Sequence, residues 1–371
     1  MRAVGIVFSN IHDDELPELV SKRTFASIPF AGRYRLIDFV LSNMVNSGID
    51  TVGLITKSNY PSLMDHVGNG KDWDLARKNG GLILLPPYGN AISYNGLYND
   101  RLGALKGISN FIRRADEEYV VLTDCDYVCR INYDKIIKAH IKKGADVTLV
   151  YHNYVVKENA KQSGVVIATD ENGRVENIRH RENIDENAKV FMNMYIMRKS
   201  LLERFIMDSL ANAHQHFTTD ILGANLKSLK VYGYEYKGYV ACIDSLQSYY
   251  DRSLELLDSN KREELFGARD IYTKVKDSAP TRFGSSCVVK NSLIADGCVI
   301  EGHVENSILF RDVKVGRGTV IKNSIVMQNT VTGDNVTLNA IIADKNVVIK
   351  DGRSLCGAEN HPFYISKGTM I

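Results

Sequence analysis

Hydrophobic positions in the first 258 residues alternate between short apolar runs and longer segments with helical spacing. The apolar runs predict strands over residues 2–8, 51–56, 119–123 and 146–151. The segments between them predict helices over residues 34–47, 104–115 and 131–143. Strands that alternate with helices form parallel βαβ units, so the pattern predicts a doubly wound α/β domain. Ligands of such sheets bind at the carboxyl ends of the strands, here after Phe8, Thr56 and Thr123.

From about residue 285 the pattern changes to a short repeat. The strings KNSLI (290–294), ENSIL (305–309), KNSIV (322–326) and LNAII (338–342) recur, with further β-branched units between them. A repeat this short is typical of a solenoid, and three strands per coil predict a triangular, left-handed parallel β-helix. Asparagine tolerates left-handed backbone geometry, so a recurrent asparagine is expected to take a turn position in each coil. The four candidates are Asn291, Asn306, Asn323 and Asn339.

The two patterns define the expected domains. We expect an α/β domain over residues 1–258, a polar linker over 259–284 with room for one helical turn, and the β-helix over 285–371. The open ends of a solenoid usually need covering, so docking on the first domain or on another subunit is expected.

Composition narrows the class of protein. The net charge of +2 gives no general attraction to nucleic acid or to an anionic membrane. No apolar stretch approaches the ~18 residues of a membrane span, and the first residues do not resemble a signal peptide. The six cysteines are scattered without zinc-site spacing, which is typical of thiols in a reducing compartment. We therefore expect a cytoplasmic protein.

The string PFAGRYRLIDFVLSNMVNSGIDTVGLIT (29–56) resembles bacterial glucose-1-phosphate adenylyltransferases, also called ADP-glucose pyrophosphorylases. Those enzymes make ADP-glucose from ATP and glucose 1-phosphate for glycogen synthesis. The likeness continues in HVGNGKDWDL (66–75), GYVACIDSLQSYYDRSLELL (238–257) and GCVIEGHVENSILFRDVKVG (297–316). The resemblance implies a nucleotidyltransferase-like (Rossmann-like) domain followed by a left-handed β-helix.

Nucleotidyl transfer needs a loop that exposes backbone N–H groups to a triphosphate, cations for the developing charge, and carboxylates for Mg²⁺. The family carries a Gly-Gly-x-Gly-x-Arg-Leu loop after its first strand. Here the same place reads FSNIHDDELPEL (8–19), which has no glycine. Its three consecutive acidic residues, 13–15, would repel a triphosphate.

The other catalytic positions are altered too. The Lys-Pro of the family falls at Phe25 and Ala26, and the residues alone leave open whether the neighbouring Lys22 and Arg23 substitute. The resemblance places Asp126 in the metal-binding position, but Cys242 stands where the second carboxylate belongs. A thiol is a poor ligand for Mg²⁺, although Asp244 lies two residues along and could face the same side.

The sugar-phosphate elements, which correspond to residues 101–109 and 179–182, lack the matching threonine, glutamine, lysine and proline. We therefore expect Phe25, Asp126 and Cys242 to be degenerate positions rather than a catalytic set. The chain is expected to hold no cofactor or metal of its own, with Mg²⁺ only in a catalytic partner.

The resemblance then implies a non-catalytic subunit that associates with a catalytic paralogue, as a homo- or hetero-tetramer, and raises its activity. Arg33 and Arg35 match positions of cations near the family's site for anionic effectors, and arginine forks suit phosphate. Local salt bridges at a helix start are the alternative. Three other functions stay open: a weakly active nucleotidyltransferase with a rearranged site, a stand-alone sugar-phosphate sensor, and an acyltransferase using His303.

Overall fold

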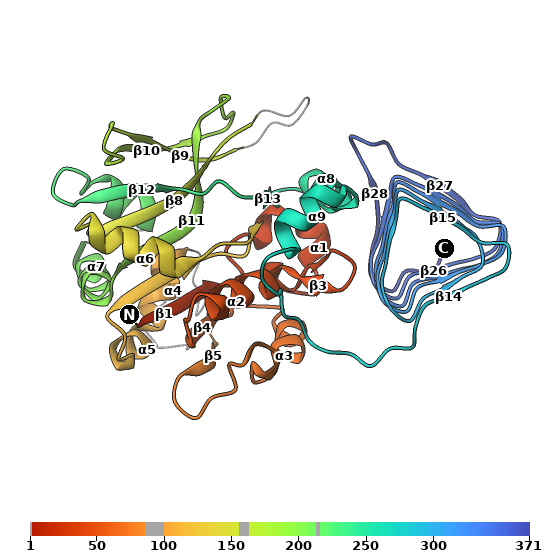
Figure 1. Ribbon diagram of the computed structural model, residues 1–371, viewed down its shortest axis with the longest axis horizontal. Helices are drawn as coiled ribbons and strands as arrows, with labels where there is room; N and C mark the ends of the chain where they lie inside the picture. Colours follow the sequence, from red (N-terminus) through yellow and green to blue (C-terminus); the bar gives the residue numbers. More distant parts are fainter. Residues whose placement is uncertain (1, 87–99, 156–162, 213–215) are drawn as a thin grey trace. The chain divides into compact units, whose positions relative to one another are not determined.

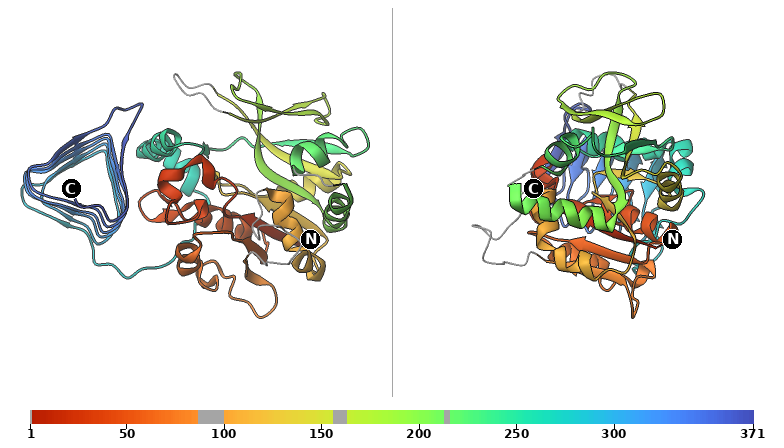
Figure 2. Two further views of the ribbon diagram at one scale, coloured as in Figure 1. Left: turned by 180° about the vertical axis from the view of Figure 1, so that it is seen from behind. Right: turned by 90° about the vertical axis from the view of Figure 1, so that its left-hand side faces the viewer.

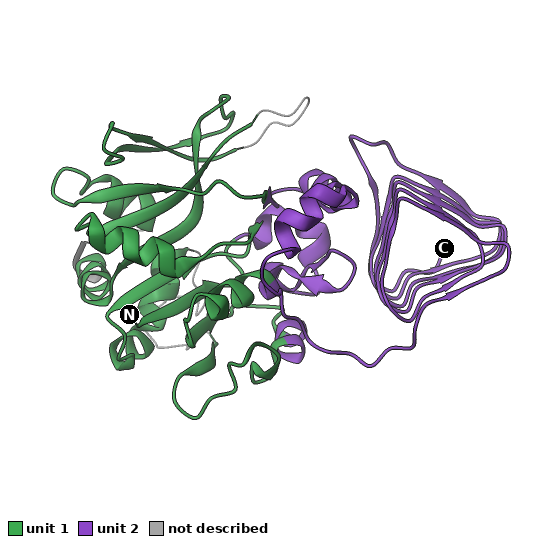
Figure 3. Cartoon of the chain, in the orientation of Figure 1, with its two compact units in different colours: residues 1–11, 39–60, 67–240 green, residues 12–38, 61–66, 241–371 purple. Residues whose placement is uncertain are grey.

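The computed structural model describes residues 2–86, 100–155, 163–212 and 216–371. The chain forms two compact units, shown in different colours in Figure 3. Unit 1 comprises Met1–Ile11, Phe39–Tyr60 and Val67–Val240, and unit 2 comprises His12–Asp38, Pro61–His66 and Ala241–Ile371. Neither unit is continuous in sequence, and unit 2 combines the repeats with segments from the first third of the chain.

Unit 1 is built on one nine-stranded mixed sheet (Figure 1). Its strands are β1 (Ala3–Phe8), β4 (Thr51–Ile55), β5 (Gly81–Leu85), β6 (Tyr119–Thr123), β8 (Val147–Asn153), β9 (Gly164–Thr169), β10 (Val175–Arg181), β11 (Lys189–Arg198) and β12 (Val231–Glu235). The order is β10-β9-β11-β6-β1-β4-β5, with β8 paired to β11 and β12. Strands β6, β1, β4 and β5 are parallel, which confirms the predicted doubly wound core. β11 runs antiparallel to β6, so the other half of the sheet is mixed.

Helices cover both faces of the parallel core. The helical segments near it are α2 (Leu36–Asn46), α4 (Arg101–Gly107), α5 (Ser109–Arg114), α6 (Tyr133–Lys142), α7 (Lys199–Asn212) and the π-helix η4 (Phe217–Gly223). Ile6 of β1 shares one buried apolar cluster with Leu105 of α4 and Leu202 of α7. A Cβ at Gly5 would lie 2.8 Å from the Met44 sulfur of α2, on the opposite face. Adjacent residues of a strand point to opposite faces, so β1 is buried between two helical layers.

The predicted helices exist but their ends differ. The helix expected from residue 34 begins at Leu36, because Tyr34–Arg35 form strand β3 against β2 (Pro29–Phe30). The helix expected over 104–115 is two short helices that meet at Ile108. The helix expected over 131–143 is α6, which begins after Asn132 because the side chain of that residue accepts a hydrogen bond from the Lys135 N–H.

The repeats of unit 2 form a β-helix of three parallel five-stranded sheets, which appears as a triangle in Figure 1 and from behind in Figure 2. The first sheet contains β14 (Arg282–Phe283), β17 (Val299–Ile300), β20 (Lys314–Val315), β23 (Val331–Thr332) and β26 (Val348–Ile349). The second contains β15 (Val288–Lys290), β18 (His303–Glu305), β21 (Val320–Lys322), β24 (Thr337–Asn339) and β27 (Ser354–Cys356). The third contains β16 (Leu293–Ile294), β19 (Ile308–Leu309), β22 (Ile325–Val326), β25 (Ile341–Ala343) and β28 (Phe363–Ile365).

The predicted asparagine turn holds in three coils and is wrong in the fourth. Asn291, Asn306 and Asn323 have φ values of 41°, 48° and 45°. Asn339 instead lies on β24, where it pairs in register with Lys322, and Ala340 takes the left-handed position with φ 53°. In the strand register, Ala340 and not Asn339 corresponds to Asn323 of the preceding coil.

The remaining elements of unit 2 are short. They are the helical segments η1 (Asp13–Glu15), α1 (Pro17–Val20), η2 (Phe25–Ser27), α8 (Leu246–Leu254), η5 (Glu255–Leu257) and α9 (Ser259–Phe266). Helix α9 lies in the expected linker and has eight residues, with the Asp258 side chain capping it, so this interval holds more than one helical turn.

Four further elements complete the described chain: α3 (Pro61–Val67), η3 (Lys71–Trp73), β7 (Tyr127–Cys129) and β13 (Val240–Cys242). Across the described residues, none of the helices has the length and apolar character that a membrane crossing requires. The six cysteines, all of which lie in described segments, form no disulfide with one another.

Candidate functional site

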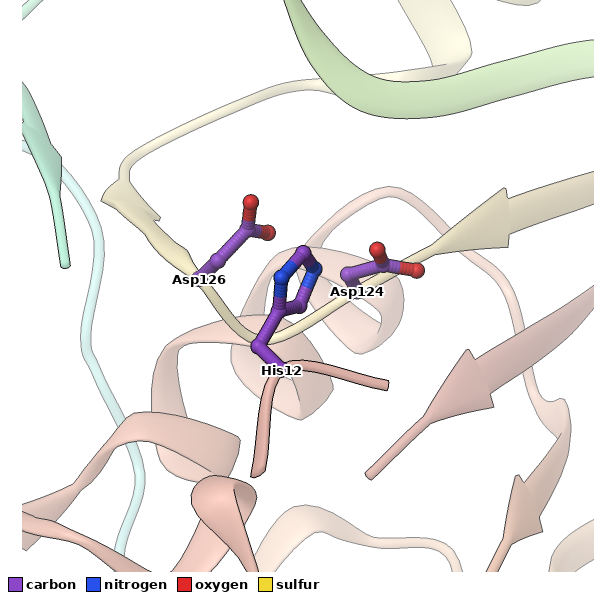
Figure 4. A group of neighbouring side chains, drawn as sticks. All are labelled: His12, Asp124 and Asp126. Carbon is purple, nitrogen blue, oxygen red and sulfur yellow. The ribbon is translucent and has the colours of Figure 1, made fainter. Parts of the chain in front are cut away.

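Two carboxylates stand at the carboxyl end of β6, in the middle of the unit 1 sheet. Asp124 and Asp126 lie on the segment that joins β6 to β7, and Figure 4 shows both side chains on the same side of it. Both residues are buried, and one oxygen of each lies within 4.8 Å of the other. This is the edge at which doubly wound sheets bind their ligands, and Asp126 follows the strand over 119–123 as the sequence predicted.

The Asp124 carboxylate is bound by an arginine of the same unit. Arg101 donates from Nε to Asp124 Oδ1 at 3.3 Å and from Nη2 to Asp124 Oδ2. The Asp124 side chain is fully buried and the Arg101 side chain is 17% exposed. Burial is the largest single effect on the pKa of Arg101 and would lower it, but the Asp124 charge and hydrogen bond, with Tyr195 and Asp126, together raise the pKa. The guanidinium therefore stays charged and neutralises Asp124.

The Asp126 carboxylate is held by an amide. Asn193 Nδ2 donates to Asp126 Oδ2 at 2.6 Å. Asn193 has a φ of 56° and lies where the pairing of β11 with β8 becomes irregular, so its side chain is turned toward the edge of the sheet. Mg²⁺ needs carboxylate oxygens that are open to it, and here Arg101 occupies both oxygens of Asp124 and Asn193 occupies Oδ2 of Asp126. With the Arg101 charge on Asp124, the two carboxylates as they stand do not fit a divalent cation.

The segment just after β1 uses its side chains to bind neighbouring loops. Ser9 Oγ donates to the Ile55 carbonyl at 2.7 Å, and Asn10 Nδ2 donates to the Ser58 carbonyl at 3.2 Å. Asn10 Oδ1 also accepts from the Lys57 N–H. A phosphate-binding loop would expose its backbone N–H groups instead, and such loops use glycine for that reason.

The continuation of this loop in unit 2 is fixed by its own acidic residues. Asp13 Oδ1 accepts from the Phe25 N–H at 2.9 Å, and Glu15 Oε1 lies 2.8 Å from His12 Nδ1. The Phe25 ring is buried, with its centroid 5.7 Å from that of His12. Phe25 is thus a packing residue of this loop.

Cys242 and Asp244 lie at the end of β13 and at the start of α8. Cys242 is buried at the end of β13. Asp244 belongs to the start of α8: Ser245 Oγ donates to its Oδ1 at 3.2 Å, and the Asp244 N–H donates to Ser248 Oγ. Burial raises the pKa of Asp244. This carboxylate therefore supports the cap of α8, which the sequence did not suggest.

A second group of charges lies within unit 2, and we name Arg23, Arg35 and Lys345 the basic cluster. Arg23 Nη2 donates to both oxygens of Asp344 at 2.7 Å, and both side chains are nearly fully buried. Tyr364 Oη donates to Asp344 Oδ2 at 2.8 Å. Arg23 therefore pairs with Asp344 of the β-helix, which bears on whether it could substitute for the family's lysine.

The other two members of the basic cluster, Arg35 and Lys345, lie near carboxylates as well as near each other and Arg23. Arg35 donates from Nη1 to the Ser62 carbonyl at 2.6 Å and to Ser62 Oγ at 3.1 Å. Burial, together with the Arg23 charge, lowers the pKa of Arg35 to about 10. Burial and the two arginines lower the pKa of Lys345 well below its usual value. Groups that repel one another in this way favour an anion among them.

Arg33 does not belong to this cluster. Its side chain is exposed and lies over the Tyr34 ring, 5.6 Å from the centroid. The sequence paired Arg33 with Arg35, but Arg33 precedes β3 and its guanidinium lies over the Tyr34 ring, whereas Arg35 lies on β3 and donates to Ser62. Lys345 was missed, although two adjacent charged residues in an apolar repeat, Asp344–Lys345, are a signal that could have found it.

Three further regions add no site. A cavity of about 750 Å³ opens beside the amino ends of β4 and β5, near Thr51 and Gly80, which is the edge opposite the carboxylates. Arg179–Glu182 include the exposed end of β10, with Arg181 paired to Asp185. His303, which an acyltransferase would use, lies on β18, and its Nε2 is 3.6 Å from Glu305 Oε2.

Known proteins match both halves of the chain. Residues 16–259 match the Nucleotidyl transferase family, and residues 277–362 match the "GlmU-like, C-terminal hexapeptide" family. The chain therefore belongs to the nucleotidyl transferase family, with a hexapeptide-type β-helix behind the transferase domain.

Proteins similar over most of the chain show which branch of the nucleotidyl transferase family it belongs to. The glycogen biosynthesis protein GlgD of Bacillus subtilis is 36% identical over 99% of this chain and 96% of its own length. GlgD of Geobacillus stearothermophilus is 39% identical over 100% of this chain and 97% of its own length. The glucose-1-phosphate adenylyltransferase of Mycoplasma mobile is 34% identical over 86% of this chain and 84% of its own. Within the ADP-glucose pyrophosphorylase family, this chain is thus a GlgD-like member.

Proposed function

We propose that the chain is a non-catalytic subunit that binds a catalytic glucose-1-phosphate adenylyltransferase and raises its production of ADP-glucose for glycogen synthesis. The observation that carries the proposal is the occupied carboxyl edge of the unit 1 sheet. Arg101 binds Asp124 and Asn193 binds Asp126, where a transferase would hold its metal and phosphates. The full-length similarity to GlgD proteins supports the same function. We place this activity in the cytoplasm, where glycogen precursors are made.

The retained β-helix supports association with another subunit. β14, β15 and β16 begin the three sheets, so their outer edges lie at the end of the described solenoid. Phe283 and Val288 on these edges are 54% and 40% exposed. Exposed strand edges with apolar side chains favour pairing with another chain. A tetramer with the catalytic paralogue would cover them.

The test is a coupled pyrophosphate-release assay with ATP, Mg²⁺ and glucose 1-phosphate. It compares this chain alone, the catalytic paralogue from the same genome alone, and the two mixed, with light scattering to give the mass of the complex. We expect no turnover by this chain and a clear gain in the mixture. Robust turnover by this chain alone would establish the rearranged transferase instead, and silence in the mixture would favour the stand-alone sensor.

A pair of variants locates the contact. Phe283→Asp places a charge on the solenoid edge and is expected to reduce activation in the mixture. Val275→Asp is the matched control, because Val275 is 70% exposed in the extended segment before β14 and lies on no strand edge. Equal loss of activation in both variants would argue against a contact at this end of the solenoid.

We further propose that the chain binds an anionic effector through Arg35, with Arg33 as a candidate second contact. The support is the gathering of three cationic side chains in the basic cluster, where Arg23 pairs with Asp344 and burial lowers the pKa values of Arg35 and Lys345. Guanidinium groups bind phosphate through paired hydrogen bonds.

A further inference from the structure

The carboxyl edge of unit 1 has two carboxylates around one positive charge, as a metal site does, but the charge is the Arg101 guanidinium. A divalent cation would lie between the Asp124 and Asp126 carboxylates and take oxygens from each. Arg101 spreads one positive charge over a planar fork that reaches both oxygens of Asp124. Asp126 also acts on the Arg101 charge, because it is among the groups that raise the Arg101 pKa against the effect of burial.

The position of Arg101 is fixed by the helix that carries it. Asp100 caps α4 by accepting from the Gly103 N–H at 2.7 Å, so Arg101 is the first residue of the helix. Leu102 and Leu105 of the same helix are fully buried in the unit 1 core. Because the backbone of Arg101 is fixed in this way, its side chain loses little entropy on binding. The guanidinium is therefore pre-organised for Asp124.

Arg101 and a metal ion are alternatives at this edge. The buried Asp124 carboxylate requires a positive partner, since an unpaired buried charge is strongly unfavourable. With the guanidinium in place, a second cation would meet like charge at short range in a poorly screened setting. With the guanidinium removed, the two carboxylates would be left as hard oxygen ligands without a cation.

We infer that Arg101 is a specificity-determining residue that stands in for a divalent cation at the carboxyl edge, and so excludes metal ions and metal-bound nucleotides from it. This inference rests on the proposed loss of catalysis and supplies a cause for it. It also assigns the two aspartates a retained capacity to bind metal, which the arginine masks.

The test is a Mn²⁺ titration of the full chain followed by electron paramagnetic resonance, which reports free Mn²⁺, with the melting temperature as a second readout. Arg101→Ala is expected to bind one Mn²⁺ at least about tenfold more tightly than the unmodified chain. Arg101→Ala combined with Asp124→Asn should lose that gain. Arg198→Ala is the matched control, because Arg198 forms an exposed pair with Glu118 at 3.4 Å in the same unit.

An Arg101→Ala chain that folds but binds Mn²⁺ no better than the unmodified chain would overturn the inference, as would tight binding by the unmodified chain. If the variant aggregates, refolding with and without Mn²⁺ decides: rescue by Mn²⁺ supports the inference, and failure to rescue contradicts it. The titration needs no catalytic partner. A negative titration would therefore contradict the role of Arg101 but not the proposed activation of the partner. A negative mixing experiment would contradict the activation but not the role of Arg101.

Discussion

The carboxyl edge of unit 1 and the basic cluster of unit 2 each contain a buried arginine–aspartate pair, but the charges around the pairs differ. Beside Arg101–Asp124 stands one further carboxylate, Asp126, which an amide holds. Beside Arg23–Asp344 stand two further cations, Arg35 and Lys345. In the first region one cation lies among carboxylates, whereas in the second three cationic side chains lie close enough to lower the pKa values of Arg35 and Lys345. The balance of charge around a pair, and not the pair itself, decides whether a ligand is attracted.

The largest effect is expected from breaking the pair that holds unit 2 together. Arg23→Ala leaves the Asp344 carboxylate buried without its cation, which should lower the free energy of unfolding by about 3–5 kcal/mol. Arg317→Ala is the control, because Arg317 is 79% exposed and its 3.3 Å contact with Glu301 should contribute less than about 1 kcal/mol. Urea unfolding measures both. Similar losses of unfolding free energy in the two variants would mean that the buried pair stabilises the chain no more than the exposed one.

An intermediate effect is expected from anions at the basic cluster. Inorganic phosphate should stabilise the chain by about 2.7 kcal/mol at a hundredfold excess over its Kd, whereas chloride at equal ionic strength should not. Arg35→Ala and Lys345→Met should each reduce this stabilisation, which thermal unfolding would follow. Arg33→Ala separates the two arginines: an exposed Arg33 predicts a smaller loss than Arg35. If phosphate stabilised all three variants as much as the unmodified chain, the proposed effector site would be contradicted.

The smallest effect is expected from His66, which lies beside the basic cluster. Its Nε2 is 2.6 Å from Asp38 Oδ1, yet burial lowers its pKa below the usual 6.5, against the opposing effect of Asp38. A lowered folded-state pKa means that the unfolded chain binds the proton more readily. The contribution of this group to stability is therefore complete above pH 6.5 and is lost as the pH falls through the folded-state pKa.

His66→Gln keeps a hydrogen-bonding side chain without this titration. We expect the unfolding free energy of the unmodified chain to fall more steeply below pH 6.5 than that of the variant, when both are measured by urea unfolding across the acid range. His361→Gln provides the comparison, since His361 is an exposed histidine of the same unit. Parallel pH profiles for His66→Gln and the unmodified chain would show that His66 does not titrate in this way.

Local pattern was enough for most elements of the fold. The strand over Tyr119–Thr123 was predicted at its observed bounds, and the three-stranded coil followed from the repeat. The start of α2 was missed because Tyr34–Arg35 pair with β2, and helical spacing does not reveal a hairpin. Asn339 was predicted at a turn because it repeats the asparagine of the other strings, but the strand register places it on β24.

The candidate site divides in the same way. The sequence by itself predicted an incomplete catalytic set, because no glycine follows β1 and because Phe25 and Cys242 stand where the family resemblance implies a lysine and a carboxylate. Only the tertiary structure decided what the remaining charges do. Arg101 meets Asp124 across 23 residues of sequence, and Arg23 meets Asp344 across 321. Ion pairs depend on distance in space and on burial, and a linear pattern contains neither until the chain has folded.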